Sequence, residues 1–319
     1  MKRLAILDDY EHAAMEAADW SPLDGVVDIT VFDEHIDAED ALAARLDDFE
    51  IVFLMRERTP FPASLLARLP RLELIITSGM RNFSIDLDAA KANGVTVTGT
   101  PILPYPAAEH TWALMLALAK NIARGDRGMR NGAWTDTLAI GLKGKTLGVV
   151  GLGKLGSQVA RVGLAFGMQV IAWSQNLARK RCEEVGVSYA TREELFTNSD
   201  FVTIHLHVGE RNRGLVTAED FERMKPEAYL INTSRGPIVV ENDLIDALQR
   251  GRIAGAGLDV YDIEPLPAEH ALRRAPNTVL TPHQGYVTIE NYRGFYATAI
   301  QNILAWLDGQ AINVVSRSA

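Results

Sequence analysis

One stretch in the middle of the chain combines three glycines at a spacing that suits nucleotide binding. Gly151, Gly153 and Gly156 form the pattern G-x-G-x-x-G between an apolar strand-like run and a helix-like run. The first glycine permits a tight turn, the second lets the backbone approach a pyrophosphate, and the third lets the helix pack close to the strand. The N–H groups of Lys154 and Leu155 would face the phosphates at the start of the helix. The pattern predicts a dinucleotide-binding turn, with a plain packing turn or an S-adenosylmethionine site as alternatives.

The position that commonly binds the adenosine ribose carries no acid in this chain. Dinucleotide turns have an Asp or Glu about twenty residues further on, where it binds the ribose hydroxyls. Here Ser174 takes that place, and no Asp or Glu occurs from Gly151 to Cys182. No carboxylate would repel a 2′-phosphate, Ser174 and Asn176 can donate hydrogen bonds, and the basic run 179–181 adds positive charge. NADP, or tolerance of both NAD and NADP, is therefore slightly favoured, unless the basic residues simply solvate the next helix.

Three further polar residues follow apolar strand-like runs in the second half of the chain. They are Arg235 in INTSRGP, Glu264 in GAGLDVYDIEPLP and His283 in LTPHQGY. Ligands bind beyond the carboxyl ends of the strands in open α/β sheets, so these side chains are expected to converge there. Each residue alone also has a structural explanation: a surface ion pair, a solvated loop acid and a hydrogen-bonded loop histidine.

Strand-like and helix-like segments alternate along most of the chain and predict an α/β fold. Continuous apolar runs such as EIVFLM and LELIIT, separated by amphipathic helices, indicate parallel sheets covered on both faces. The prolines in TPILPYP interrupt the alternation. Residues 107–123 are then predicted to form one long, mostly buried helix. The last helix-like segment, 290–309, has no further strand and is predicted to pack on the first domain, which makes that domain discontinuous.

Composition restricts the class of protein. The 319 residues are 47% apolar, a length that suggests about two domains. The net charge of −9, without a basic block, disfavours a nucleic-acid partner. One cysteine and no signal-peptide-like or membrane-spanning segment predict a cytoplasmic protein without membrane contact. His205 and His207 lie on one face of a strand-like run without an obvious third ligand, so no metal site is predicted. Hydrolase chemistry is not predicted, because no G-x-S-x-G motif occurs.

These motifs together resemble the D-isomer-specific 2-hydroxyacid dehydrogenase family. The resemblance covers nearly the whole chain and rests on GLGKLG, NTSRGP, LDVYDIEP and TPHQGY. It implies two Rossmann-like domains with doubly wound parallel sheets, in which a cofactor domain (104–287) is inserted into a discontinuous substrate domain (1–103 and 288–319). It also implies a homodimer that transfers hydride between NAD(P)H and C2 of a small 2-oxo or 2-hydroxy acid. The glyoxylate and hydroxypyruvate reductase type is favoured.

The resemblance further implies roles for individual residues. His283 would be the acid/base at the substrate oxygen, Glu264 would fix its tautomer and favour its protonated form, and Arg235 would bind the substrate carboxylate. Asp259 would contact the nicotinamide carboxamide. The residues that would line the cofactor are Leu206, Thr233 and Gly285. The residues whose backbone would hold the substrate carboxylate are Ser78, Gly79 and Met80.

The chain departs from the family in this last loop. The family commonly has glycine where Arg81 stands and an acid where Phe83 stands. Arg81 would then recognise a second anionic group or pair with an acid such as Asp86, and the pairing is favoured. Arg56 has a similar ambiguity. His110 is favoured as a structural residue.

Two other functions remain as alternatives. A non-catalytic NAD(H)-sensing binding protein or corepressor would share this fold, but the intact set of Arg235, Glu264 and His283 favours an enzyme. A Rossmann methyltransferase would leave these three residues without a role. The related formate dehydrogenase has Gln where this chain has Glu264.

Overall fold

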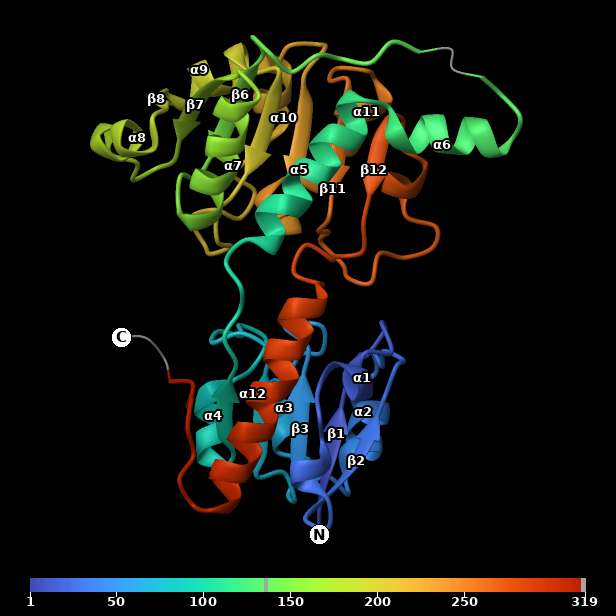
Figure 1. Cartoon of the computed structure of the whole chain (residues 1–319), viewed down its shortest axis with the longest axis vertical. Coiled ribbons are helices and arrows are strands. Elements are labelled where there is room, and N and C mark those ends of the chain that lie inside the picture. The colour runs from blue at the N-terminus through green and yellow to red at the C-terminus, as the bar shows by residue number, and fades with distance from the viewer. Residues whose placement is uncertain (135–136, 317–319) are drawn as a thin grey trace. The chain divides into compact units, whose positions relative to one another are not determined.

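The computed structural model describes residues 1–134 and 137–316. The chain divides into two compact units, Met1–Leu103 with Val287–Ala319, and Pro104–Tyr286. Within the described residues, the first unit holds a parallel sheet of five strands and the second a parallel sheet of seven (Figure 1). The predicted α/β class with two doubly wound parallel sheets is confirmed.

The first unit has the strand order β2-β1-β3-β4-β5. Its strands are β1 (Lys2–Ile6), β2 (Val27–Val31), β3 (Ile51–Leu54), β4 (Leu74–Thr77) and β5 (Thr96–Gly99). Its helices are α1 (Ala14–Ala17), α2 (Glu39–Leu46), α3 (Ala63–Leu66), α4 (Leu87–Ala92) and α12 (Ile289–Leu307), with a 3₁₀ turn at Ser21–Leu23. The apolar runs of β3 and β4 are buried at every position, as expected for strands covered on both faces.

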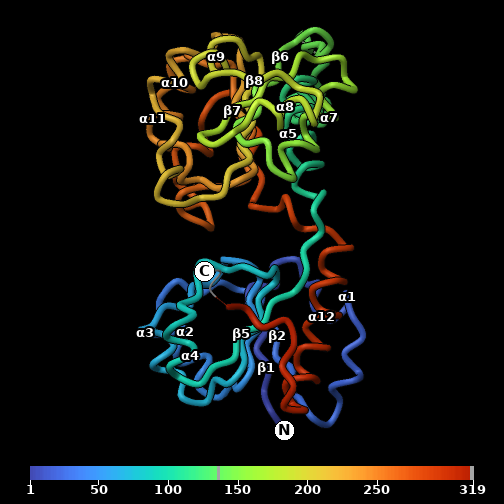
Figure 2. Tube along the Cα trace, turned by 90° about the vertical axis from the view of Figure 1, so that its left-hand side faces the viewer, coloured from blue at the N-terminus to red at the C-terminus, as the bar shows by residue number. Residues whose placement is uncertain are grey.

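Side chains from β3 alternate between two cores in this unit. Val52 packs with Leu42 of α2 and Leu65 of α3 on one face. On the other face the ring of Phe53 lies 5.0 Å from that of Tyr296 in α12. Figure 2 shows α2, α3 and α4 on one side of the sheet and α1 and α12 on the other.

The second unit has the strand order β12-β11-β10-β9-β6-β7-β8. Its strands are β6 (Thr146–Val150), β7 (Gln169–Trp173), β8 (Ser188–Tyr189), β9 (Phe201–Ile204), β10 (Tyr229–Asn232), β11 (Gly255–Leu258) and β12 (Thr278–Leu280). Its helices are α5 (Pro106–Ala119), α6 (Ile122–Arg130), α7 (Lys154–Ala165), α8 (Arg179–Val185), α9 (Arg192–Asn198), α10 (Ala218–Arg223) and α11 (Glu241–Gln249). Two 3₁₀ turns occur at Gly236–Ile238 and Ala271–Arg274. The chain reverses its direction of strand addition beside β6, which is where ligands bind in such sheets.

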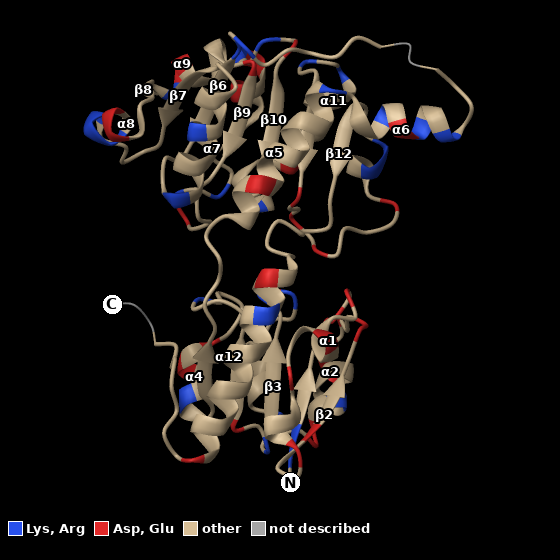
Figure 3. Cartoon of the chain, viewed as in Figure 1, with Lys and Arg blue, Asp and Glu red and all other residues tan. Residues whose placement is uncertain are grey.

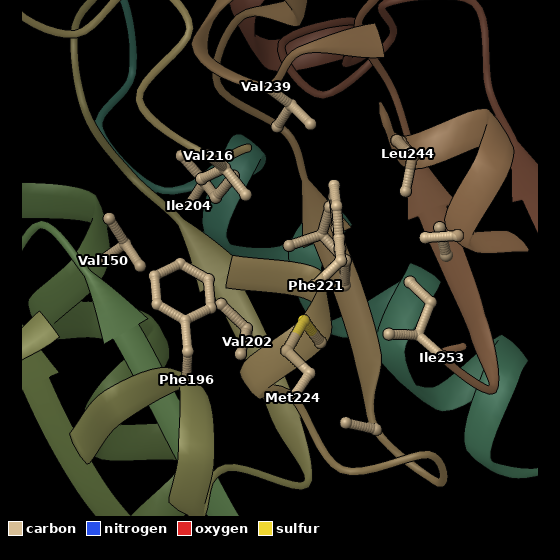
Figure 4. Packing of buried hydrophobic residues seen from close by; sticks show 14 of the residues in the cluster. Val150, Phe196, Val202, Ile204, Val216, Phe221, Met224, Val239, Leu244 and Ile253 are labelled. Atoms are coloured by element: carbon tan, nitrogen blue, oxygen red, sulfur yellow. The ribbon is translucent and has the colours of Figure 1, made fainter. Parts of the chain in front are cut away.

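Apolar side chains cover both faces of this second sheet. On one face Phe196 and Phe221 pack against Val150 and Val202 (Figure 4). On the other face Trp112 of α5 belongs to a separate buried cluster with strand and helix residues. Figure 2 shows α5 and α7 on one side of the sheet and α9, α10 and α11 on the other.

The single long helix predicted over residues 107–123 is wrong. Helix α5 ends at Ala119, and α6 begins at Ile122. Between them Asn121 adopts a left-handed backbone with φ +54°, a conformation that asparagine tolerates better than most residues. The apolar pattern runs across this break and could not reveal it. Helix α6 has no buried residue and carries basic side chains (Figure 3). Among the described residues, no helix is long and apolar enough to cross a membrane.

Candidate active site

The glycine turn follows β6 and is shaped by close backbone contacts. Gly151 has φ +98°, and a Cβ atom there would lie 2.5 Å from the carbonyl oxygen of His205. A Cβ atom on Gly156 would lie 2.0 Å from the carbonyl oxygen of Gly151. At Gly153, by contrast, a Cβ atom would meet nothing within 4 Å. Two glycines therefore permit the turn itself, and the third leaves one side of it open for a ligand.

Helix α7 begins directly at this open side. The N–H groups of Lys154 and Leu155 have no hydrogen-bond partner within the described residues. Unpaired N–H groups and the helix dipole attract anions at a helix start. The turn therefore fits the pyrophosphate of a dinucleotide, which the sequence also predicts.

The predicted ribose site around Ser174 and Asn176 is called the ribose edge below. The basic run 179–181 supplies less positive charge to it than the sequence predicts. Arg181 donates from Nη2 to Ser157 Oγ at 2.9 Å and from Nε to the Leu152 carbonyl at 3.3 Å, so it braces the glycine turn. The guanidinium of Arg179 lies 4.5 Å from the ring centroid of Tyr189. Figure 3 shows both basic and acidic residues in α8. Two of the three basic residues in the run 179–181 therefore contact partners other than Ser174.

Glu264 and His283 form a close pair of ionisable side chains at the carboxyl edge of the second sheet, after β11 and β12. Glu264 Oε2 lies 2.5 Å from His283 Nδ1, and Glu264 Oε1 accepts the N–H of Tyr261 at 2.8 Å. The side chains remain 33% and 23% exposed, so both are partly open to solvent. Because Nδ1 faces the carboxylate, it carries the proton, and Nε2 is the nitrogen left for a ligand.

Arg235 follows β10 on a loop that packs against the loop of Glu264. A Cβ atom on Gly236 would lie 2.1 Å from the carbonyl carbon of Tyr261, so the two backbones touch at this glycine. Asn232 fixes the turn by donating to the Arg235 carbonyl at 3.0 Å. Arg235 Nη1 donates to the Ser234 carbonyl at 2.7 Å. The structure therefore joins Glu264 and His283 directly and brings the Arg235 loop alongside them.

Asp259 holds the loop that carries His283. Its side chain is 1% exposed. Oδ1 accepts the hydroxyl of Thr281 at 2.6 Å and the N–H of Gln284 at 2.8 Å, while Oδ2 accepts the N–H of Gly285 at 2.8 Å. The bonds flank His283 on both sides and fix its backbone, which has φ +51°. Sequence reasoning missed this clamp, although Thr281, Gln284 and Gly285 all lie within two residues of His283.

His110 joins the same buried group. Its Nε2 lies 2.9 Å from Thr281 Oγ1 and 3.2 Å from Asp259 Oδ1. It comes from the first turns of α5, where Glu109 is the acid of the first turn. The histidine therefore supports the loop of His283 from a neighbouring helix.

The remaining predicted cofactor residues lie on neighbouring loops of the same unit. The Leu206 side chain packs against the glycine turn, because a Cβ atom on Gly151 would lie 2.8 Å from its Cδ2. The Ser234 hydroxyl donates to the Leu206 carbonyl. The Thr233 hydroxyl lies 2.7 Å from that of Thr111.

The partly buried His205, near the glycine turn, is neutral at physiological pH. Burial lowers the pKa of His205 to about 4, and its Nε2 lies 2.9 Å from Thr203 Oγ1. A neutral ring adds no charge beside the glycine turn. In the part of the chain that the structure describes, no group of three or more His, Cys, Asp or Glu could hold a metal ion.

In the first unit, the predicted carboxylate loop follows β4. The Ser78 N–H donates to the Leu54 carbonyl at 3.0 Å, and the Gly79 N–H donates to Thr100 Oγ1 at 3.1 Å. The Met80 N–H has no partner among the described residues. Two of the three N–H groups of this loop therefore already have acceptors within the fold.

Arg56, in the loop that follows β3, contacts the loop of Ser78. Its Nη1 donates to the Ser78 carbonyl at 3.1 Å, and a Cβ atom on Gly79 would lie 2.0 Å from the same nitrogen. Gly79, at φ +90°, is therefore favoured by its backbone conformation, and the Arg56 guanidinium lies directly over it. Arg56 also lies 3.5 Å from Glu57 Oε2.

The favoured pairing of Arg81 with Asp86 is wrong. The Asp86 carboxylate accepts the N–H groups of Asp88 at 3.1 Å and Ala89 at 3.0 Å, which makes it the N-cap of α4. Within residues 1–134 and 137–316, Arg81 forms no ion pair.

Comparison with known proteins gives a consistent result. A family model described as D-isomer specific 2-hydroxyacid dehydrogenase, NAD binding domain, matches residues 112–285. A glyoxylate reductase of Aeropyrum pernix is 38% identical over 264 residues, which are 79% of this chain and 79% of that protein. A hydroxypyruvate reductase of Blautia hydrogenotrophica is 28% identical over 310 residues, 94% of this chain and 95% of that protein.

A solved structure agrees over the whole length. The phosphoglycerate oxidoreductase from Vibrio cholerae superposes with a TM-score of 0.92 at 34% identity, covering 97% of this chain and 100% of that chain. The predicted family and enzyme class are confirmed. The chain therefore belongs to the D-isomer specific 2-hydroxyacid dehydrogenase family, and it is an oxidoreductase that binds NAD(P) and acts on small 2-oxo or 2-hydroxy acids by hydride transfer.

Proposed function

We propose that this protein reduces small 2-oxo acids of the glyoxylate or hydroxypyruvate type and prefers NADPH as its cofactor. The observation that carries the proposal is the 2.5 Å contact between Glu264 Oε2 and His283 Nδ1. This contact leaves Nε2 as the proton-transferring atom. The names of the curated relatives support this class of substrate.

The chain's own residues supply proton transfer and orientation. The bound cofactor supplies the hydride that reaches C2 of the substrate. His283 Nε2 donates a proton to the substrate oxygen during reduction and accepts it in the reverse direction. Glu264 accepts a hydrogen bond from the Nδ1–H group, which fixes the tautomer and orients the ring. Arg235 binds the substrate carboxylate through its planar guanidinium and polarises the neighbouring carbonyl.

The unit Pro104–Tyr286 is proposed as the cofactor domain and the other unit as the substrate domain. The N–H groups of Lys154 and Leu155 would bind the pyrophosphate at the turn of Gly151, Gly153 and Gly156. The ribose would contact Ser174 and Asn176. The residues proposed to line the rest of the cofactor are Leu206, Thr233, Asp259 and Gly285.

The loop of Ser78, Gly79 and Met80 is proposed to hold the substrate carboxylate. Among these residues Met80 has the N–H group that is unpaired within the described chain, and Arg56 adds positive charge against the same backbone. The homodimer and the cytoplasmic location remain predictions from the sequence.

A panel of 2-oxo acids tests the proposed function. Purified protein is mixed with NADPH or NADH and each acid in turn, and the loss of the reduced-nicotinamide absorbance is followed. We expect turnover with glyoxylate and hydroxypyruvate and a higher kcat/KM with NADPH. Tight cofactor binding without turnover of any acid would instead favour the non-catalytic sensor.

A substitution at the ribose edge tests the cofactor preference. In Ser174→Asp a carboxylate would repel the 2′-phosphate and bind the ribose hydroxyls of NADH. The ratio of kcat/KM for NADPH over NADH should fall by about tenfold or more. Gln169→Glu is the matched control, because it adds the same charge at the opposite end of β7. An unchanged ratio in Ser174→Asp would show that this position does not set selectivity.

A further inference from the structure

A glutamine at the ribose edge connects two loops that are distant in sequence. Gln175, directly after Ser174, donates from Nε2 to the carbonyl oxygen of Arg211 at 3.1 Å. Arg211 lies in the segment 207–213 that follows β9. Strands β7 and β9 flank β6 on opposite sides. The segment must therefore extend past the glycine turn at the carboxyl edge to reach the end of β7.

The segment is held in a defined turn by its own backbone. Asn212 donates from its backbone N–H to the Gly209 carbonyl at 2.9 Å and from its side chain to the His207 carbonyl at 2.8 Å. Arg213 N–H reaches the same Gly209 carbonyl at 3.0 Å. Gly214 N–H anchors the end of the turn to the Pro237 carbonyl at 2.8 Å. The position of the Arg211 backbone beside Gln175 is therefore fixed from both sides.

The arginines near the ribose edge differ in what their side chains contact. Arg179 stacks on Tyr189, and Arg181 braces the glycine turn. Arg213 lies near Asp262. Burial and the charge of Glu241 raise the pKa of Asp262, and the charge of Arg213 partly offsets this rise. Arg211 is exposed and forms no side-chain hydrogen bond or ion pair within the described residues. It is thus an unengaged guanidinium whose own backbone touches the residue after Ser174.

We propose that Arg211 is a cofactor-specificity residue that binds the 2′-phosphate of NADP from the β9 side of the glycine turn. Ser174 admits the same phosphate from the β7 side because it carries no charge. A guanidinium suits this ligand, since its fork of N–H donors matches phosphate oxygens. Glu210, the neighbouring acid, leaves the segment with a net positive charge because Arg211 and Arg213 outnumber it. The inference rests on the proposed NADPH preference and deepens it.

Direct binding measurements test this proposal without using catalysis. Dissociation constants are measured by calorimetry for NADPH and NADH, and for the half-cofactors 2′,5′-ADP and 5′-AMP. In Arg211→Gln we expect affinity for NADPH and 2′,5′-ADP to fall by about tenfold or more, while affinity for NADH and 5′-AMP stays within about twofold. The NADPH effect should shrink as ionic strength rises, because the lost interaction is between charges.

Three variants separate charge, geometry and loop position. Arg213→Gln is the matched control, since it removes an equal charge two residues away and should leave all four affinities within about twofold. Arg211→Lys keeps the charge without the fork and should lose part of the 2′-phosphate preference. Gln175→Ala removes the tether and should also lose part of that preference, with NADH binding retained. Circular dichroism checks that each variant folds.

The outcomes distinguish this proposal from the proposed function. Equal losses for NADPH and NADH in Arg211→Gln, or the same selective loss in Arg213→Gln, would overturn the role of Arg211. A wild-type protein that binds 5′-AMP as tightly as 2′,5′-ADP would overturn it too. Turnover of 2-oxo acids with NADH would still support the reductase in each of these cases.

Discussion

Replacing His283 with alanine is expected to lower kcat by about 10²–10⁴-fold, the usual contribution of a general acid or base. The reason is that Nε2 is the free nitrogen of a ring whose Nδ1 faces Glu264 at 2.5 Å. Affinity for the cofactor should change little, because the glycine turn and helix α7 do not depend on this side chain. Steady-state turnover with hydroxypyruvate and calorimetric binding of NADPH measure the two quantities separately.

Two controls make this result specific. His283 has φ +51°, so alanine strains the backbone, whereas asparagine tolerates that conformation. His283→Asn should therefore lose turnover while keeping thermal stability closer to wild type. His12→Asn changes another histidine of positive φ that is 73% exposed, and it should leave turnover unchanged. Turnover of His283→Asn within about threefold of wild type would contradict proton transfer by His283.

Replacing Arg235 with glutamine is expected to reduce kcat/KM for 2-oxo acids by about 10²–10³-fold, because two charge-assisted hydrogen bonds to the carboxylate are lost. The KM for the 2-oxo acid should rise along with a fall in kcat, since Arg235 also polarises the carbonyl. The dissociation constant of NADPH should stay near that of wild type. Substrate-saturation kinetics at fixed NADPH measure this division.

The controls for Arg235 test geometry against charge. Arg235→Lys retains the charge but not the planar fork, and we expect it to recover only part of the activity. Arg223→Gln removes a partly exposed guanidinium that pairs with Glu219 in α10, and it should behave as wild type. An unchanged KM for the 2-oxo acid in Arg235→Gln would show that another group binds the carboxylate.

Much of the fold could be predicted because local pattern and burial agree in it. The apolar runs that become β3 and β4 are buried on both faces, so they predict parallel strands without tertiary information. The break at Asn121 could not be predicted, because a left-handed residue leaves the apolar pattern intact. Strand β8, with two residues, is too short to produce a periodic signal.

The site shows the same division between pattern and tertiary contact. The order of Arg235, Glu264 and His283 after successive strands predicted that their loops would meet, because parallel strands share a carboxyl edge. The orientation of the Arg181 side chain depends on its hydrogen bonds to Ser157 and the Leu152 carbonyl, which only the folded chain brings within reach. Long flexible side chains choose among several partners, so their sequence position alone does not locate their charge.

The central claim is that hydride passes from the cofactor to C2 of a 2-oxo acid while His283 supplies the proton. The most direct measurement uses hydroxypyruvate with NADPH deuterated at C4 of the nicotinamide, on the face from which transfer occurs, in ordinary water. Mass spectrometry and NMR of the product should find the deuterium at C2 of glycerate, in the D-configuration. Product that carries only solvent hydrogen at C2 with either deuterated face would contradict direct transfer and the account built on it.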